Sequence, residues 1–315
     1  MGNRAGEALG ERPRTHWLAR FILILLLAQL ADGQRASADP ETFNSALPVA
    51  EGEFLFRGQF LYKQASNDPS PADRMVNVIG GISLLGYGVT QDFTVFGVLP
   101  YLDKQLDVRL PGGRQVTRRT NGIGDARLFG RYTVFRDDMP GRTFRIAPFV
   151  GIETPTGNDD HRDSLGALPA PLQLGSGSWD PFAGIVATYQ RLDFEIDASA
   201  SYKVNTKANH FEFGDEARLD ASFQYRLWPR TLASGVPGFL YGVLESNLIY
   251  LGKNEIRGLR DRSSGGTTLF IAPGLQFVTR RWVLEAIVQL PAFQNLHGSA
   301  LKDDFTVRAG LRVNF

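Results

Sequence analysis

The chain has 315 residues, with 34 Lys and Arg against 33 Asp and Glu, and it contains no cysteine. Balanced charge offers no basic surface for nucleic acid, and the lack of thiols excludes a disulfide scaffold, thiolate metal sites and cysteine nucleophiles. A hydrophobic content of 43% looks ordinary, but strands with one apolar and one polar face also give such an average.

A secretory signal peptide is predicted for residues 1–38. Three arginines between residues 12 and 20 precede the apolar run 21–31, and Ala36-Ser37-Ala38 then forms an A-x-A cleavage site. An uncleaved anchor helix is the alternative, but the run is shorter than the roughly 20 residues that a membrane-spanning helix needs. If the mature chain, 39–315, enters a membrane, we expect it to cross as strands.

Alternation of apolar and polar residues dominates the rest of the chain. The stretch 192–204, LDFEIDASASYKV, alternates throughout, and the last residues, FTVRAGLRVNF, place two arginines on one face and apolar residues on the other. This period of two predicts strands. They are expected at 52–63, 76–87, 91–103, 122–135, 143–154, 179–190, 192–204, 215–228, 238–251, 267–278, 282–291 and 304–315.

The lengths of these strands and of their connections favour an outer-membrane barrel. Most segments have 10–14 residues, as tilted membrane-crossing strands require, whereas soluble strands average about five or six. Short and long connections alternate, with 229–237 as the exception. We therefore predict an all-β, antiparallel up-and-down transmembrane barrel of about 12 strands, with short periplasmic turns, long external loops and periplasmic termini. A soluble β-sandwich is the competing architecture, but its strands would be shorter.

The predicted inner face of the barrel carries charges of both signs. They can pair across strands and stiffen the wall, which near-balance of sign favours, or select solutes by charge. Only about 14 residues, 39–52, precede the first strand, and we expect them to be too few for a plug. The candidate pore-lining residues are Arg127, Arg131, Glu153, Asp193, Glu195, Asp197, Arg218, Asp220, Arg226, Glu245, Glu285, Arg308 and Arg312.

The longest predicted loop, 155–178, is unusually apolar for an external loop. It either folds into the bore as a gate or packs on neighbouring loops. Its acidic stretch 158–163 lacks the ligand spacing of a calcium loop, so no metal site and no cofactor are predicted. The candidate gate residues are Leu165, Leu168, Leu172 and Leu174.

No catalytic residues are predicted. The chain contains neither G-x-S-x-G nor H-E-x-x-H. Ser299 and His297 are close in sequence, but they fall in a predicted loop, where a catalytic pair would lack rigid support. A barrel-borne lipid hydrolase is therefore the weakest of the functional hypotheses, and the chain is not expected to be an enzyme.

Four stretches together resemble a family of Gram-negative outer-membrane proteins labelled as the putative transporter of the MetA pathway of phenol degradation. They are GYGVTQDFTVFGVLPYLDK (86–104), GIGDARLFGRY (122–132), GIETPTGN (151–158) and LPAPLQLGSGSWDPFAGI (168–185). The resemblance implies a barrel linked to the passage of aromatic or other hydrophobic compounds.

The resulting hypothesis is an outer-membrane channel for passive uptake of small hydrophobic or aromatic compounds. A structural or adhesive barrel with a closed bore is the alternative. Expected partners are outer-membrane lipid and lipopolysaccharide, a small hydrophobic solute, and the barrel-assembly machinery, which reads terminal aromatic residues such as Phe315 in proteins of this kind. No nucleic-acid partner is expected.

Overall fold

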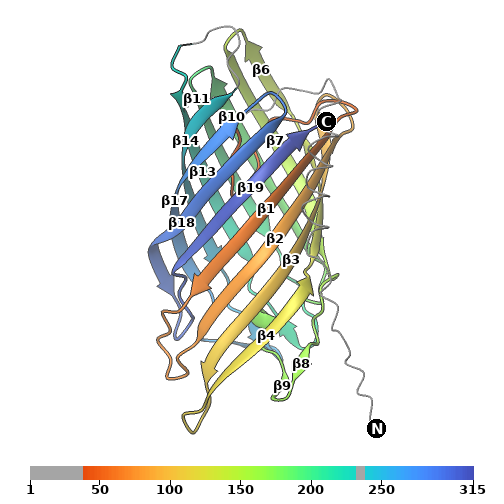
Figure 1. Cartoon of the computed structure of the whole chain (residues 1–315). Helices are drawn as coiled ribbons and strands as arrows, with labels where there is room; N and C mark the ends of the chain where they lie inside the picture. The colour runs from red at the N-terminus through yellow and green to blue at the C-terminus, as the bar shows by residue number, and fades with distance from the viewer. Residues whose placement is uncertain (1–37, 232–237) are drawn as a thin grey trace, which may run out of the picture.

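The computed structural model describes residues 38–231 and 238–315, so the predicted signal peptide lies outside the described residues except for Ala38. One closed antiparallel barrel of 12 strands makes up the fold (Figure 1). Eleven positions in the barrel are held by β1 (Phe54–Ala65), β2 (Met75–Gly88), β3 (Phe93–Arg109), β7 (Arg142–Thr154), β10 (Asp180–Arg191), β11 (Phe194–Lys203), β13 (Glu216–Trp228), β14 (Phe239–Leu251), β17 (Gly266–Val278), β18 (Trp282–Leu296) and β19 (Phe305–Asn314).

The remaining position is shared by three shorter strands, where a single strand was predicted at 122–135. They are β4 (Gln115–Ile123), β5 (Ala126–Tyr132) and β6 (Phe135–Met139). β3 pairs with β5 up to Val98 and with β4 from Tyr101 onward. Pro100, which has no N–H to donate, lies at this change of partner, and its carbonyl accepts a hydrogen bond from Gly124. Residues predicted as the loop 104–121 therefore extend the wall as a β-hairpin.

The last strand closes the barrel against the first, as predicted. β19 pairs antiparallel with β1 from Leu55 opposite Asn314 to Gln64 opposite Phe305. Phe54 and Phe315 exchange backbone hydrogen bonds of 2.7 and 2.9 Å, and their rings stack 5.8 Å apart. Because the first and last strands pair, neither presents a row of unpaired backbone groups to lipid.

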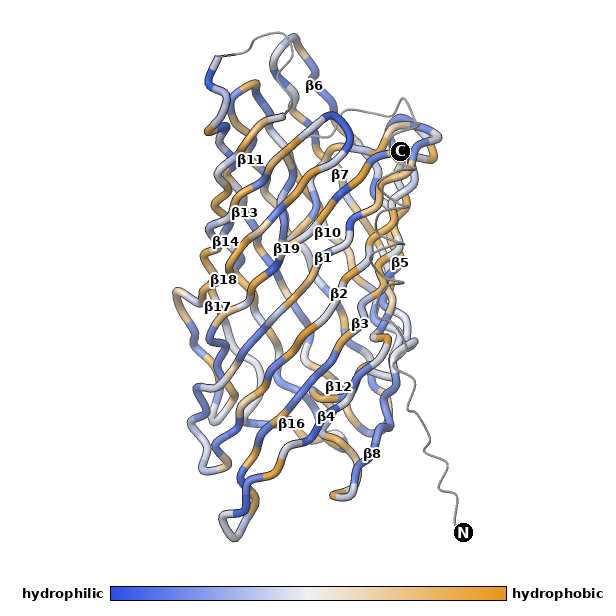
Figure 2. The backbone as a smooth tube through the Cα atoms, in the orientation of Figure 1, coloured by the Kyte–Doolittle hydropathy of each residue, from blue (hydrophilic) through white to orange (hydrophobic). Residues whose placement is uncertain are grey.

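Apolar side chains are exposed and polar side chains are buried, the reverse of a sheet in a water-soluble protein. On β13, Leu219 and Phe223 are 57% and 45% exposed, whereas Asp220 and Gln224 are 5% and 0% exposed. Apolar and polar residues alternate along the strands around the barrel (Figure 2). This arrangement suits lipid outside and polar groups within. In the described part of the chain, no helix is long and apolar enough to cross a membrane.

The two ends of the barrel differ. Short turns lie at the end that carries Phe315, and longer connections lie at the opposite end (Figure 1). Small secondary-structure elements in the long connections are β8 (Arg162–Asp163), β9 (Gly166–Ala167), the 3₁₀ helix η1 (Ala170–Leu172), β12 (Phe211–Glu212), β15 (Glu255–Ile256) and β16 (Leu259–Arg260). We call these two ends the turn end and the loop end.

Candidate functional site

The bore has an apolar sector, which β2 and β3 provide. β2 carries no charged side chain on either face. Its inward residues lie opposite those of β3, so the two strands form a stripe that runs along the bore and is interrupted by a single charge, Lys104. The apolar side chains of this stripe are Val76, Val78, Ile82, Leu84, Phe96, Val98, Pro100, Leu102, Leu106 and Val108. None of them was among the predicted pore-lining residues, although the uncharged sequence of β2 already indicated such a sector.

Four phenylalanines widen the stripe toward its turn end. The ring of Phe96 on β3 stacks on that of Phe129 on β5, with centroids 4.7 Å apart. Phe149 on β7 and Phe182 on β10 meet Phe129 edge-on, at 6.3 and 6.0 Å. Gly151 makes this packing possible, because a Cβ there would lie 2.4 Å from the Cβ of Phe129 and 2.5 Å from the ring of Phe182. The stripe therefore passes into an aromatic cluster.

The sector that runs from β13 through β14, β17, β18 and β19 to β1 is charged and extensively hydrogen-bonded. Arg57 on β1 and Glu285 on β18 form a buried bidentate pair with both distances 2.7 Å. Arg218 pairs with Asp220 at 3.1 Å, and Asn247 also donates to Asp220 at 2.8 Å. Such pairs stiffen the wall, as the balance of charge predicted.

The predicted pore-lining residues on strands occupy the inner face. Near the loop end, the carboxylate of Glu153 forms ion pairs with both Arg127 and Lys203. Asp193 instead lies in the turn between β10 and β11, where its exposed carboxylate accepts a hydrogen bond from Arg226. The other strand residues are Arg131, Glu195, Asp197, Glu245, Arg308 and Arg312, along with the members of the pairs described above.

A segment that was expected to be too short for a plug crosses the bore. We call residues 38–50 the N-terminal arch. At one side of the bore, the carbonyl of Asp39 accepts a hydrogen bond from Gln276 at 2.5 Å, and the carboxylate pairs with Arg312. The carboxylate of Glu245 on β14 then accepts hydrogen bonds from the backbone N–H groups of Glu41 and Thr42 at 2.6 and 3.2 Å. The arch thus begins on the charged sector.

The arch ends on the far side of the barrel. The N–H of Ala46 donates to Thr188 on β10 at 2.7 Å, and the N–H of Val49 donates to Thr94 on β3 at 3.1 Å. β3 and β14 lie on opposite sides of the strand order. Ala46 and Val49 are buried, so a single extended pass of chain fills the section that a folded domain would fill in a larger barrel.

Little space remains beside the arch. A gap of about 30 Å³ lies between it and the wall, lined in part by Asn44, Leu84 and Arg131. That volume holds roughly two water molecules. Toward the loop end the bore opens into a vestibule of about 450 Å³, bordered by Leu102, Arg127 and other inward residues. In this conformation the bore is therefore closed near its turn end and hollow near its loop end.

The long loop folds inward over the vestibule. Leu168 and Leu172 are buried against Leu106 of the apolar stripe, and Leu174 is buried near Gly122. Lys104 donates a 2.5 Å hydrogen bond to the carbonyl of Gln173. Three of the four candidate gate leucines thus pack on the wall of the bore, whereas Leu165 is exposed. The apolar stripe is covered by leucines at one end and by Val49 at the other.

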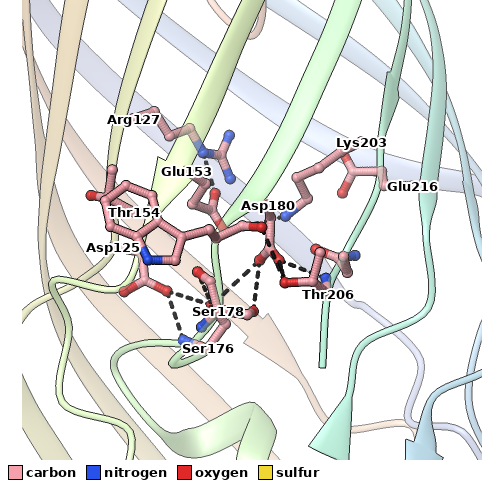
Figure 3. Close-up of polar contacts among 12 residues, drawn as sticks. Asp125, Arg127, Glu153, Thr154, Ser176, Ser178, Asp180, Lys203, Thr206 and Glu216 are labelled. Carbon is pink, nitrogen blue, oxygen red and sulfur yellow. Dashed lines mark hydrogen bonds and ion pairs between the residues drawn. The ribbon is translucent and has the colours of Figure 1, made fainter. Parts of the chain in front are cut away.

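Two carboxylates anchor this loop (Figure 3). Asp125, at the break between β4 and β5, accepts hydrogen bonds from Gly157 N–H at 2.9 Å and from Ser176 N–H and Oγ at 2.6 and 3.0 Å. Asp180 accepts from Ser178 at 3.2 Å and from the N–H of Thr206 at 2.7 Å. Hydrogen bonds therefore hold the loop 155–178 against the break between β4 and β5.

Gly157 and Gly175 complete the anchor. A Cβ on Gly157 would lie 2.7 Å from the backbone N of Gly175, so this close approach requires glycine. Asp125, Gly157, Gly175 and Asp180 lie in the last three of the four stretches that carry the family resemblance. The sequence predicted no role for these four residues, because the contact between the three stretches is visible only in the folded chain.

Residues 74–285, about two thirds of the chain, match the model of the family described as "Putative MetA-pathway of phenol degradation". The chain therefore belongs to this family, as the four stretches indicated. No curated protein matches the chain.

A solved outer-membrane channel supports the fold, and two autotransporter barrels are less similar. An outer membrane channel from Pseudomonas putida F1 is 14% identical, with a TM-score of 0.67 over 89% of this chain and 100% of that chain. The transport unit of the autotransporter AIDA-I from Escherichia coli is 10% identical, with a TM-score of 0.46 over 94% of this chain and 98% of that one. The β domain of the Bordetella autotransporter BrkA is 13% identical, with a TM-score of 0.44 over 84% and 100%.

Proposed function

We propose that this member of the phenol-degradation family is an outer-membrane channel for the passive uptake of small hydrophobic or aromatic compounds. The observation that carries the proposal is the apolar stripe of β2 and β3, which faces a charged and hydrogen-bonded sector across the same bore. A family member similar in fold to an outer membrane channel is a suitable setting for such a path.

A two-sided bore suits a solute that is itself two-sided. An aromatic ring keeps its apolar faces against Leu102, Val98 and Phe96, while a hydroxyl or carboxyl group points to the hydrated, charged wall. Buried apolar area is worth roughly 25 cal/mol per Å², so the stripe concentrates such a solute without trapping it as an enclosed pocket would. Once the N-terminal arch has moved aside, movement down a gradient requires no energy source.

The proposed orientation places the turn end in the periplasm and the loop end outside the cell. Short turns on the side of Phe315 and long loops on the other support it, since outer-membrane barrels have this asymmetry. Solute then meets the vestibule and its leucine cover first and the N-terminal arch last. Outer-membrane lipid, lipopolysaccharide and the assembly machinery remain the expected partners.

A structural or adhesive barrel is the second candidate, and the arch is the observation that favours it, because the bore is closed in this conformation. Recordings in planar bilayers distinguish the two. Steady conductance that phenol or benzyl alcohol reduces by occupying the bore supports the channel. Complete absence of conductance, with no solute flux into proteoliposomes, supports the closed barrel.

Substitution in the stripe tests the proposed path. Ile82→Asn places an amide among apolar side chains, and flux of benzyl alcohol should fall while ion conductance persists. Ser199→Asn, an inward polar change on β11, is the matched control and should leave that flux unaltered. Equal flux through both variants would contradict the role of the stripe.

A further inference from the structure

Arg131 is an unusual charge in this bore. Its side chain is almost completely buried, yet in the described part of the chain no carboxylate lies within ion-pair distance of its guanidinium. Its donors are used by the arch: one terminal nitrogen donates to the carbonyl of Ser45 and the other to that of Leu47. The guanidinium carbon lies 4.9 Å from the centroid of Phe96.

The arch also places an apolar group beside this arginine. Val49 packs on Phe96 and Phe129, the stacked pair of the aromatic cluster. The arch therefore presents two acceptor oxygens to the guanidinium and a branched hydrocarbon to the neighbouring rings. A small molecule with two carboxylate oxygens and one aromatic ring carries the same two features.

We propose that Arg131, Phe96 and Phe129 form a binding site for a small aromatic carboxylate, which the N-terminal arch occupies while the bore is closed. A carboxylate matches the guanidinium fork better than two separate carbonyls do, and its hydrogen bonds are charge-assisted. Its ring takes the place of Val49 against the phenylalanines, where an offset or edge-on contact is favourable. The inference rests on the proposed channel function and names a substrate class for it.

Competition between arch and solute links binding to opening. If the arch leaves alone, Arg131 exchanges its two carbonyl partners for water. An aromatic acid that enters from the vestibule instead offers the guanidinium charge-assisted hydrogen bonds, which neither the carbonyls nor water provide. A ligand shifts a conformational equilibrium only through its preference for one state, and here that preference is for the state without the arch.

Binding to the purified full-length protein tests the site directly, with benzoate and benzyl alcohol as probes in titration calorimetry. Wild type should bind benzoate about tenfold or more tightly than benzyl alcohol, since hydrogen bonds to a charged group are worth about one decade or more each. Arg131→Gln should abolish that preference. Arg136→Gln, an arginine on β6 whose side chain is paired with Asp92, is the matched control and should retain it.

Phe96→Leu provides a second measurement if Arg131→Gln does not fold. It keeps the charge and removes one ring, so benzoate affinity should fall several-fold while affinity for acetate stays the same. Undiminished benzoate preference in Arg131→Gln would overturn the assignment. So would undiminished benzoate affinity in Phe96→Leu, or equal affinity of wild type for benzoate and benzyl alcohol.

A disulfide tests whether arch and ligand compete. Ala46 and Ala147 are both fully buried in one cluster, and the chain has no cysteine of its own, so Ala46→Cys with Ala147→Cys creates a single reversible tether. When the tether is reduced, benzoate should bind and raise the open fraction in bilayers; when it is oxidised, both effects should disappear. Equal benzoate binding in the two forms would overturn the competition. Absence of conductance in every form would contradict the channel, whereas the calorimetry would still decide the site.

Discussion

Asp125 holds the long loop inside the vestibule, and Asp125→Ala should release it. The carboxylate accepts three hydrogen bonds, one from the N–H of Gly157 and two from Ser176, at 2.6 to 3.0 Å. Hydrogen bonds to a charged acceptor are each worth about 1.5–3 kcal/mol. In the variant, water in the vestibule replaces part of this hydrogen-bond energy. We therefore expect the free energy of opening the loop to fall by about 2–4 kcal/mol. At 1.4 kcal/mol per decade, that is about 30-fold to several hundredfold.

Amide hydrogen exchange measures this opening. Backbone N–H groups of Leu174 and Gly175 donate to the carbonyl of Asn158 at 3.0 Å, so they report directly on the closed loop. Their exchange should accelerate by the factor given above in Asp125→Ala, while amides of β14 keep their rates. Asp160→Ala removes an exposed carboxylate from the same loop and is the control. Equal protection of the loop in wild type and Asp125→Ala would refute the anchor.

Three further predictions concern the loops and the seam. Deletion of residues 165–175 removes the leucine cover, so single-channel conductance and solute preference should change; unchanged values would contradict a gate. Burial would raise the pKa of Asp68, but hydrogen bonds from Arg74 and Ser70 outweigh it and hold that pKa below 3.8. Proteolytic resistance of the loop 66–74 should therefore be constant from pH 8 to pH 5. It should begin to fall below about pH 4 and be lost only as the pH falls through the much lower pKa of folded Asp68. Deletion of Phe315 removes its ring and hydrogen-bond contacts with Phe54 and should destabilise the seam by about 1–3 kcal/mol, seen as a lower midpoint of urea unfolding on heat-modifiability gels.

Alternation was enough to predict the barrel, because lipid on one side and a wet bore on the other impose a period of two on every strand. The last strand illustrates this: its two arginines were assigned inward from sequence, and Arg312 does pair with the half-buried Asp39 of the arch. The broken fourth strand was harder to predict, since only Gly124 and Asp125 separate β4, whose inward residues are even-numbered, from β5, whose inward residues are odd-numbered. Turn chemistry alone does not distinguish such a break from an ordinary strand end.

The candidate site was predicted less completely, for two physical reasons. The prediction selected inward residues by their charge, so it named Arg127 and Glu153. It omitted Leu84, on a strand that is uncharged throughout, and Val98, which lies opposite Leu84 on β3. The anchor at Asp125 depends on three distant stretches meeting, and a single sequence contains no record of that contact.

The N-terminal arch was not predicted, because the sequence of residues 38–50 has almost no pattern that indicates a segment crossing the bore. Its main attachments are its own backbone groups: N–H groups donate to Thr188 and Thr94, and carbonyls accept from Arg131. Any sequence supplies such groups. What selects the arch is the wall, whose inward acceptors and donors would otherwise be buried in the narrow half of the bore without partners. About a dozen residues at roughly 3.3 Å each reach at most some 40 Å, enough to cross the bore once even with the bends at 41–43 and 46. A short segment can therefore close a barrel of this size, provided that the wall rather than the segment supplies the specific side chains.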